Sequence, residues 1–284
     1  MFNTQHPTAP TQIGEGRPDS AVLFIHGLAG SHETWCHFAN HLKAKWTEAD
    51  CFGLEYDEYY GSQSIVKRIP ILRNLAKIRR IIIGPDLATL SRHLRTVVDE
   101  LCEEYDNVII IAHSMGGLIA RRYIVDVLDE TKSVGKVRSL ITYATPHHGS
   151  ILANHYLTFC SAFVPFFIKV SKQIAELSRR NDFIEQLNLN WTKLRVEDKI
   201  EFVRVVGLQD WIVNFHSSSY RNDPTVKVIA GKNHYNIIVP SKLRNKDDAF
   251  MVTYNYLKNF RKRYAEKLDF QSDFDFEYDS YDFD

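Results

Sequence analysis

Asn107-Val-Ile-Ile-Ile-Ala-His-Ser-Met-Gly-Gly117 is the segment that most clearly indicates the fold class. The apolar run that ends at Ala112 predicts a buried strand, and the residues from Gly116 to Leu128 predict a helix. Ser114 therefore stands in a strand–turn–helix, with small residues two positions before and after it. That is the pattern of a nucleophile elbow, although alanine replaces the glycine usual at the first of these positions. The alternative is a serine that only caps an ordinary helix.

The rest of the chain alternates short apolar strands with helices. Strands are also expected at Ala21–Ile25, Cys51–Tyr56, Val137–Tyr143, Glu201–Val206 and Thr225–Ala230. Helices are expected at Thr34–Lys45, Leu87–Glu104 and Asp247–Tyr264. This alternation predicts an α/β protein with a mostly parallel central sheet and helices on both faces. Ligands of such sheets bind beyond the carboxyl ends of the strands.

A serine nucleophile needs a base, and the base needs a carboxylate that orients it. In this kind of sheet the chain order is serine, then acid, then histidine. Asp210 follows the strand at 201–206, and His234 follows the strand at 225–230, so these two are the candidates. The alternative acids are Asp247 and Asp248. The alternative histidines are His147 and His148, which precede the acid, and His216, which precedes the last strand.

A glycine-containing loop, His26-Gly27-Leu28-Ala29-Gly30, lies at the end of the first expected strand. Glycine lets a backbone approach a ligand closely. We expect the amide groups of Leu28 and Met115 to form an oxyanion hole, which stabilises the charge that develops during acyl transfer. The alternative is a loop with no catalytic role. The predicted chemistry needs neither a metal nor an organic cofactor.

Four segments together resemble the lipase and esterase branch of the α/β-hydrolases that includes GPI inositol-deacylase-like proteins and their bacterial relatives. They are His26–Gly30, Ala112–Gly117, Ala144-Thr-Pro-His-His-Gly-Ser150 and His234-Tyr-Asn-Ile-Ile-Val-Pro240. The resemblance implies the α/β-hydrolase fold and hydrolysis of carboxylic esters, often lipid esters. It also implies that substrate contacts come from these motifs, and the candidates are His26, Gly27, His113, Pro146 and His147.

Two insertions interrupt the expected hydrolase domain at 21–267, and two terminal segments flank it. The insertion at 57–85 contains a basic amphipathic stretch, which suits peripheral contact with an anionic membrane or a solvated helix packed on the core. The insertion at 151–194 contains an apolar stretch, Tyr156–Val170, which suits a helical cap over an acyl groove or a buried helical hairpin. Residues 1–20 are expected to be a flexible N-terminal segment. The tail at 268–284 holds seven acidic and six aromatic residues, which predicts disorder and leaves its partner unknown.

Charge and cysteine content set broad limits on function. The chain is neutral overall, but residues 1–267 hold 35 basic and 28 acidic side chains, an excess that does not require a nucleic-acid partner. No signal peptide and no spanning helix are visible, and the four cysteines are scattered, so we expect a cytoplasmic protein with reduced thiols. Besides an esterase, an acyltransferase or thioesterase with the same triad remains an alternative. The second alternative is a protein of hydrolase fold that has no catalytic activity and acts only by binding a partner.

Overall fold

The structure is a computed structural model that describes residues 18–27, 30–56, 87–147, 182–210, 223–240, 249–260 and 262–263. Within these ranges the strands form a six-stranded sheet in the order β2-β1-β3-β4-β5-β6, and every neighbouring pair is parallel. The strands are β1 (Ser20–Ile25), β2 (Ala49–Leu54), β3 (Asn107–His113), β4 (Val137–Tyr143), β5 (Glu201–Gly207) and β6 (Val226–Ile229). The expected parallel central sheet is confirmed.

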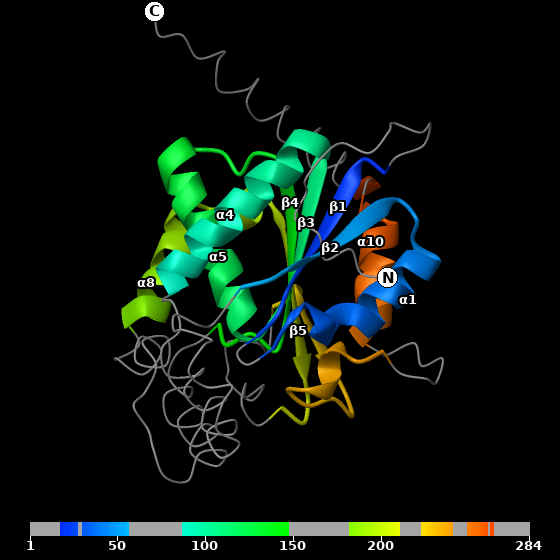
Figure 1. The fold of residues 1–284 in the computed structure, drawn as a ribbon. Coiled ribbons are helices and arrows are strands. Elements are labelled where there is room, and N and C mark those ends of the chain that lie inside the picture. The colour runs from blue at the N-terminus through cyan, green and yellow to red at the C-terminus, as the bar shows by residue number, and fades with distance from the viewer. Residues whose placement is uncertain are drawn as a thin grey trace, which may run out of the picture.

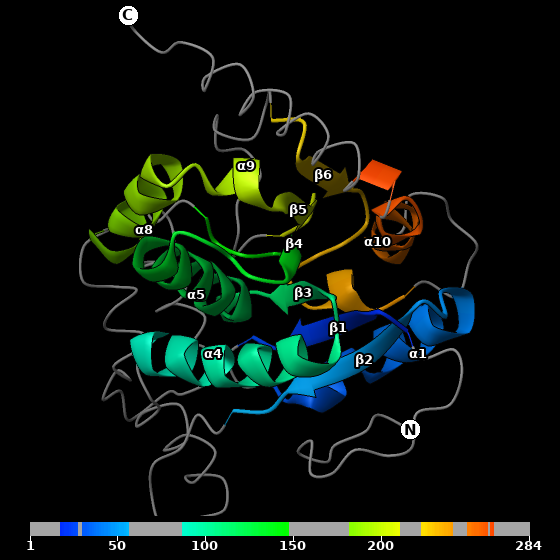
Figure 2. The same ribbon diagram turned by 90° about the horizontal axis from the view of Figure 1, so that it is seen from above.

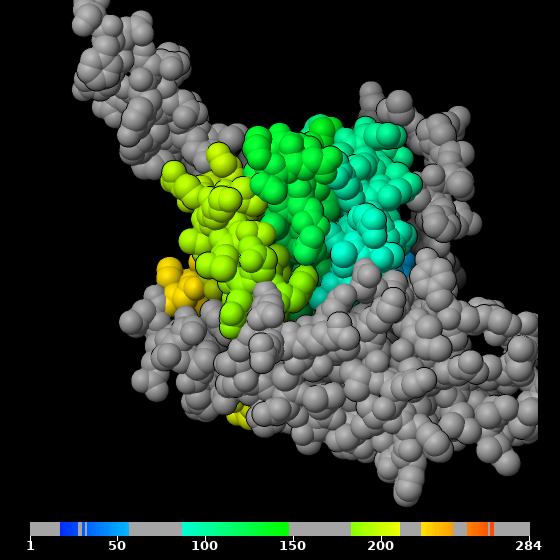
Figure 3. All heavy atoms as spheres, turned by 90° about the vertical axis from the view of Figure 1, so that its left-hand side faces the viewer, coloured from blue at the N-terminus to red at the C-terminus, as the bar shows by residue number. Residues whose placement is uncertain are grey.

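Helices cover both faces of the sheet (Figures 1 and 2). One face carries α4 (Leu87–Glu104), α5 (Met115–Thr131), α8 (Asp182–Lys193) and α9 (Val196–Lys199). The other carries the 3₁₀ helix η1 (His32–Trp35), α1 (Cys36–Lys45), the 3₁₀ helix η3 (Asn236–Ile238) and α10 (Ala249–Lys258). Figure 3 shows α4, α5 and α8 side by side across the first of these faces.

The strands β1 and β3 carry long apolar runs because both of their faces are covered. In β1, Leu23 and Ile25 pack into the core under α4 and α5, whereas Val22 and Phe24 pack into the core under α1 and α10. Successive side chains of a strand point to opposite faces, so a strand buried on both sides shows no polar alternation. The continuous apolar runs in the sequence therefore reflect the two cores of this sheet.

Several expected boundaries shift in the structure. The second strand runs from Ala49 to Leu54, not from Cys51 to Tyr56, because its pairing with β1 ends at Ile25 and Leu54. Beyond the strand, the Tyr56 hydroxyl donates a hydrogen bond to the backbone carbonyl of His26. The last helix is described from Ala249 to Lys258, and residues 247, 248 and 264 lie outside the described residues.

The end of the expected cap insertion belongs to the layer that covers the sheet. Helix α8 buries Ile184, Leu187 and Trp191 in the same core as α4 and α5. Its apolar face therefore packs on the hydrolase core, and the expected insertion bounds of 151–194 stay a prediction. The insertion at 57–85, most of the expected cap at 151–181 and the acidic tail at 268–284 lie outside the described residues.

In the part of the chain that the structure describes, no helix combines the length and the apolar character that crossing a membrane requires. Cys36, Cys51 and Cys102 are free thiols, and Cys160 lies outside the described ranges. Burial raises the pKa of the Cys51 thiol from 9.0 to about 12, so this cysteine stays protonated and packs as an apolar side chain.

Parallel strands bring the predicted functional loops to one edge of the sheet. His26 follows β1, Ser114 follows β3, Ala144 follows β4 and Leu208 follows β5. The register pairs Ile25 with Ala112, so the loops after β1 and β3 begin at the same level. All four loops therefore leave the carboxyl ends of adjacent strands, where a shared site can form.

Candidate active site

Ser114 sits at a sharp turn between β3 and α5. It is the residue that caps α5, with φ 52° and ψ −123°. A residue other than glycine rarely adopts such a conformation, and it persists only when its surroundings enforce it. Gly116 explains why the turn needs a small residue: a Cβ atom there would lie 2.4 Å from the carbonyl oxygen of His26. The strand–turn–helix predicted from the sequence therefore has the geometry of a nucleophile elbow.

Three predicted residues meet in one hydrogen-bonded chain. Nε2 of His234 lies 3.0 Å from Oγ of Ser114, and Nδ1 of His234 lies 3.1 Å from Oδ2 of Asp210. All three side chains are buried. A carboxylate only accepts, so Nδ1 carries the proton and Nε2 is left to accept one from the serine hydroxyl. This is the arrangement in which a histidine can act as a general base toward serine.

The acid and histidine loops are joined through their backbones. The amide of Leu208 donates to the carbonyl of Ile229 at 2.9 Å, and that of Gln209 donates to Lys232 at 3.0 Å. The two loops approach each other closely at Gly207, where a Cβ atom would lie only 2.3 Å from the Lys232 carbonyl oxygen. These contacts fix the distance between the loop that carries Asp210 and the loop that carries His234.

Asn233 shapes the turn that carries His234, and sequence reasoning missed this residue. Its side-chain oxygen accepts hydrogen bonds from the amides of Tyr235 and Asn236, both at 3.0 Å. In return, the Asn233 amide donates to Oδ1 of Asn236 at 2.7 Å. Asparagine commonly closes turns in this way. An asparagine directly before the expected histidine was the available signal.

His113 contacts the histidine loop. Its Nε2 donates to the backbone carbonyl of His234 at 2.8 Å. Burial lowers the pKa of His113 from 6.5 to about 3, and the neighbouring His234 lowers it further, so the ring is neutral. The sequence predicts His113 as a substrate-binding residue. In the structure its Nε2 bonds to the loop after β6, and the role of His113 as a substrate contact stays a prediction.

The loop after β1 lies against Ser114. A Cβ atom on Gly27 would be 2.9 Å from Cβ of Ser114. The ring of His26 stacks on the ring of Tyr56 with centroids 3.9 Å apart, and the Tyr56 hydroxyl donates to the His26 carbonyl at 2.6 Å. Tyr56 thus supports this loop, a role that sequence reasoning missed. Leu28, the first expected oxyanion donor, lies outside the described residues.

Met115, the other expected oxyanion donor, is the first residue of α5. Its side chain is buried in the core beneath α4 and α5. The first amide groups of a helix have no carbonyl partner within that helix. The Met115 amide therefore belongs to the end of α5 that carries the positive pole of the helix dipole, next to Ser114.

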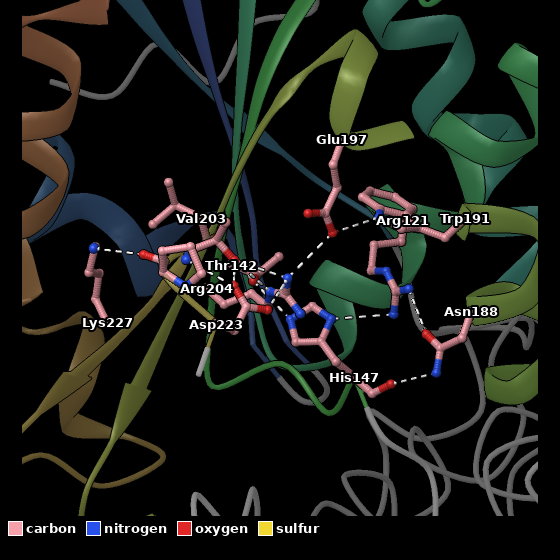
Figure 4. Close-up of polar contacts among 12 residues, drawn as sticks. Arg121, Thr142, His147, Asn188, Trp191, Glu197, Val203, Arg204, Asp223 and Lys227 are labelled. Carbon is pink, nitrogen blue, oxygen red and sulfur yellow. Dashed lines mark hydrogen bonds and ion pairs between the residues drawn. The ribbon is translucent and has the colours of Figure 1, made fainter. Parts of the chain in front are cut away.

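The loop after β4 holds the remaining predicted substrate contacts, Pro146 and His147, and both are buried. Figure 4 shows the His147 ring between Arg121 and Thr142. Its Nδ1 lies 3.3 Å from a guanidinium nitrogen of Arg121, and its Nε2 lies 3.0 Å from the Thr142 hydroxyl. Both ring nitrogens of His147 thus contact protein groups, and its role as a substrate contact stays a prediction.

A family model described as the PGAP1-like alpha/beta domain matches residues 16–208, about two thirds of the chain. The chain belongs to this family. The match includes the loop after β1, the elbow at Ser114 and the loop after β4. The resemblance predicted from the sequence motifs is thereby confirmed, and the PGAP1-like domain is an α/β-hydrolase by fold.

Curated relatives cover much of this PGAP1-like domain. Protein SERAC1 of Danio rerio is 26% identical over 256 residues, which are 78% of this chain and 36% of the relative. Protein SERAC1 of Homo sapiens is 27% identical over 222 residues, which are 68% of this chain and 29% of the relative. The chain thus spans about a third of the length of these relatives.

Solved structures show the same fold. A crystal structure of a predicted CIB-like hydrolase from Thermoplasma acidophilum covers 87% of this chain and 89% of its own, with a TM-score of 0.50 and 14% identity. At this identity the likeness concerns the fold of the PGAP1-like domain.

The alternatives for the histidine and the acid that lie outside the described residues are His148, His216, Asp247 and Asp248.

Proposed function

We propose that this chain is a serine hydrolase that cleaves carboxylic esters through an acyl-enzyme. Ser114 is the nucleophile, His234 the general base and Asp210 the group that orients His234. One observation carries the proposal: Ser114, His234 and Asp210 form a continuous buried hydrogen-bonded chain with contacts of 3.0 and 3.1 Å. A serine hydroxyl is a weak nucleophile until a base of this kind removes its proton.

In the proposed first step, Nε2 of His234 takes the Ser114 proton as Oγ attacks the ester carbonyl carbon. The carbonyl oxygen becomes an oxyanion, and the imidazolium is stabilised by Asp210. The C–O bond to the alcohol then breaks, and His234 returns its proton to the leaving oxygen. In the second half, His234 takes a proton from water as the water oxygen attacks the acyl carbon. The bond between that carbon and Oγ of Ser114 then breaks, His234 returns its proton to Oγ, and the carboxylic acid leaves.

Backbone amides are the proposed donors to the oxyanion. The Met115 amide lies at the start of α5, directly after Ser114. The loop of Gly27, which touches Ser114, leads into Leu28, the second proposed donor. Removal of one such donor typically lowers the rate by about 10²–10³-fold, so the position of this loop matters for catalysis.

Apolar side chains near the proposed triad favour an apolar acyl substrate. Leu208 is 41% exposed and lies two residues before Asp210, and Tyr235 is 48% exposed and follows His234. Val239, on the same loop as His234, is also 48% exposed. Exposed apolar groups on catalytic loops suit an acyl chain or another apolar ester group. The family resemblance to lipases and esterases supports the same substrate class.

A fluorophosphonate probe tests the proposed nucleophile, because it reacts with an activated serine. We expect the wild type to be labelled at Ser114 and the Ser114→Ala variant to remain unlabelled. Absence of labelling in the wild type, or equal labelling of both, would overturn the proposal. A panel of acyl esters, acyl thioesters and acceptor alcohols then separates the esterase from a thioesterase or an acyltransferase.

A further inference from the structure

Arg121 is a buried arginine on α5, the helix that begins beside Ser114. Its side chain is only 3% exposed, and its guanidinium carbon lies 4.8 Å from the ring centroid of Trp191 on α8. One nitrogen donates to Oδ1 of Asn188 at 2.7 Å, and another faces Nδ1 of His147 at 3.3 Å (Figure 4). Charged side chains are rarely buried to this extent without partners, and these contacts of two guanidinium nitrogens and the Trp191 ring specify the orientation of the Arg121 side chain.

The contact with Arg121 determines the orientation of His147. Because guanidinium nitrogens only donate, Nδ1 of His147 must accept, and Nε2 must carry the ring proton. Nε2 therefore donates to the Thr142 hydroxyl at 3.0 Å, and that hydroxyl donates to the Val203 carbonyl at 3.4 Å. The Asn188 amide also donates to the His147 carbonyl at 3.0 Å. Hydrogen bonds therefore fix both the ring and the backbone of His147.

The held loop rests directly on the elbow. The His147 amide donates to the Thr145 carbonyl at 3.0 Å, and the Thr145 hydroxyl donates to the carbonyl of Ser114, also at 3.0 Å. A Cβ atom on Gly117 would be 2.1 Å from Oγ1 of Thr145, so the threonine fills the space above the first turn of α5. A continuous series of contacts therefore runs from Arg121 to the backbone of Ser114.

The elbow needs such support because two unusual backbone conformations meet there. Ser114 has φ 52°, and Ala144, just before Thr145, has φ 46°. The Ser114 amide donates to the Tyr143 carbonyl at 2.9 Å, which joins the two turns. Positive φ angles at residues other than glycine persist only when surrounding contacts enforce them.

We infer that Arg121 is a positioning residue for Ser114. Through His147 and Thr145 it holds the loop after β4 against the elbow and so keeps Ser114 in the conformation that aims Oγ at His234. The inference rests on the proposed function of Ser114 as nucleophile. Arg121 itself takes no part in bond formation, and its effect is on the geometry of the reacting serine.

The test compares Arg121→Met with Arg122→Met, a matched control on the same helix. The guanidinium of Arg122 pairs with Asp126 at 2.7 Å at the surface. With a soluble short-chain ester, we expect Arg121→Met to lower kcat and the rate of fluorophosphonate labelling about 100-fold while KM stays nearly constant, because small displacements of reacting groups cost about that much. Arg122→Met should match the wild type. Labelling of folded Arg121→Met at the wild-type rate would overturn the inference.

Two further measurements keep the inference testable. His147→Asn retains an oxygen acceptor near the position of Nδ1, so it should react faster than His147→Leu, and equal rates would count against the inference. Hydrogen exchange of the peptides at 114–117 and 144–147 should be faster in Arg121→Met than in Arg122→Met, and equal exchange would overturn the inference. Hydrogen exchange does not depend on catalysis. A wild type that resists labelling would therefore refute the proposed function, while the exchange comparison would still test the positioning role of Arg121. If Arg121→Met does not fold, Arg121→Lys, which loses the forked donors, replaces it in each comparison.

Discussion

Nε2 of His113 lies 2.8 Å from the backbone carbonyl oxygen of His234. The residue that precedes the proposed nucleophile thus holds the backbone of the proposed general base. The two rings lie with centroids 5.0 Å apart. Because one end of the contact is fixed by β3, a change at His113 alters the distance between His234 and Ser114 without removing either reacting group.

We expect His113→Leu to lower kcat by about 10–100-fold with little change in KM, because the base loses its backbone anchor. His113→Gln can place an amide N–H near the position of Nε2 and should recover part of the rate. Steady-state kinetics with a soluble ester measure both effects. His41→Leu is the control, since the His41 ring also contacts a backbone carbonyl, that of His37, on the exposed side of α1. Equal rates for the Leu and Gln variants of His113 would contradict the anchoring role.

The low pKa of His113 makes the stability of the protein depend on pH. Folded His113 has a pKa of about 3, whereas an unfolded histidine has about 6.5. Between these values the unfolded chain binds a proton that the folded chain does not, so the free energy of unfolding falls as the pH falls. From about pH 7 to about pH 5 the wild type should lose about 2 kcal/mol more than His113→Gln. Urea unfolding at both pH values measures this, and parallel pH dependence would refute the assignment.

Tyr56→Phe tests the support of the loop after β1. The change removes the hydroxyl that donates to the His26 carbonyl at 2.6 Å and keeps the ring that stacks on His26. We expect a loss of about 1 kcal/mol in stability and a reduced kcat, because the loop carries a proposed oxyanion donor. Tyr105→Phe is the control: its hydroxyl contacts Asp50 at 2.9 Å, and Tyr105 precedes β3, at the opposite edge of the sheet. An equal kcat in both variants would argue against the supporting role.

Gly116→Ala should damage the elbow while the fold survives. The new methyl group would lie 2.4 Å from the His26 carbonyl oxygen, so the loop after β1 must move away from Ser114. We expect kcat to fall by about 100-fold or more. In Gly135→Ala, at φ 58° with open space around the new atom, stability should fall by about 1 kcal/mol with unchanged kcat. Active Gly116→Ala would show that the elbow tolerates the larger residue.

Much of the fold could be predicted because its signals are local. The strand at Val137–Tyr143 and the helix at Leu87–Glu104 have the bounds that their apolar patterns predict. The strand β2 was misplaced by two residues because Tyr56 continues the apolar run while its hydroxyl bonds to the loop of His26. The packing of α8 on α5 could not be predicted, because the apolar pattern of a helix does not tell which other helix it contacts.

Periodicity and turn composition depend on neighbours in the chain, so the amino-acid sequence was enough to predict the alternation of strands and helices, the elbow at Ser114 and the chain order of Ser114, Asp210 and His234. The partner that each buried polar side chain meets is seen only in the folded molecule. His113 contacts a carbonyl 121 residues away, and His147 accepts from Arg121 on the helix that follows the elbow. Such pairings depend on which donors and acceptors the parallel strands bring to the same edge of the sheet. Most buried polar groups of a protein are hydrogen-bonded, and the identity of each partner follows from the packing of distant segments.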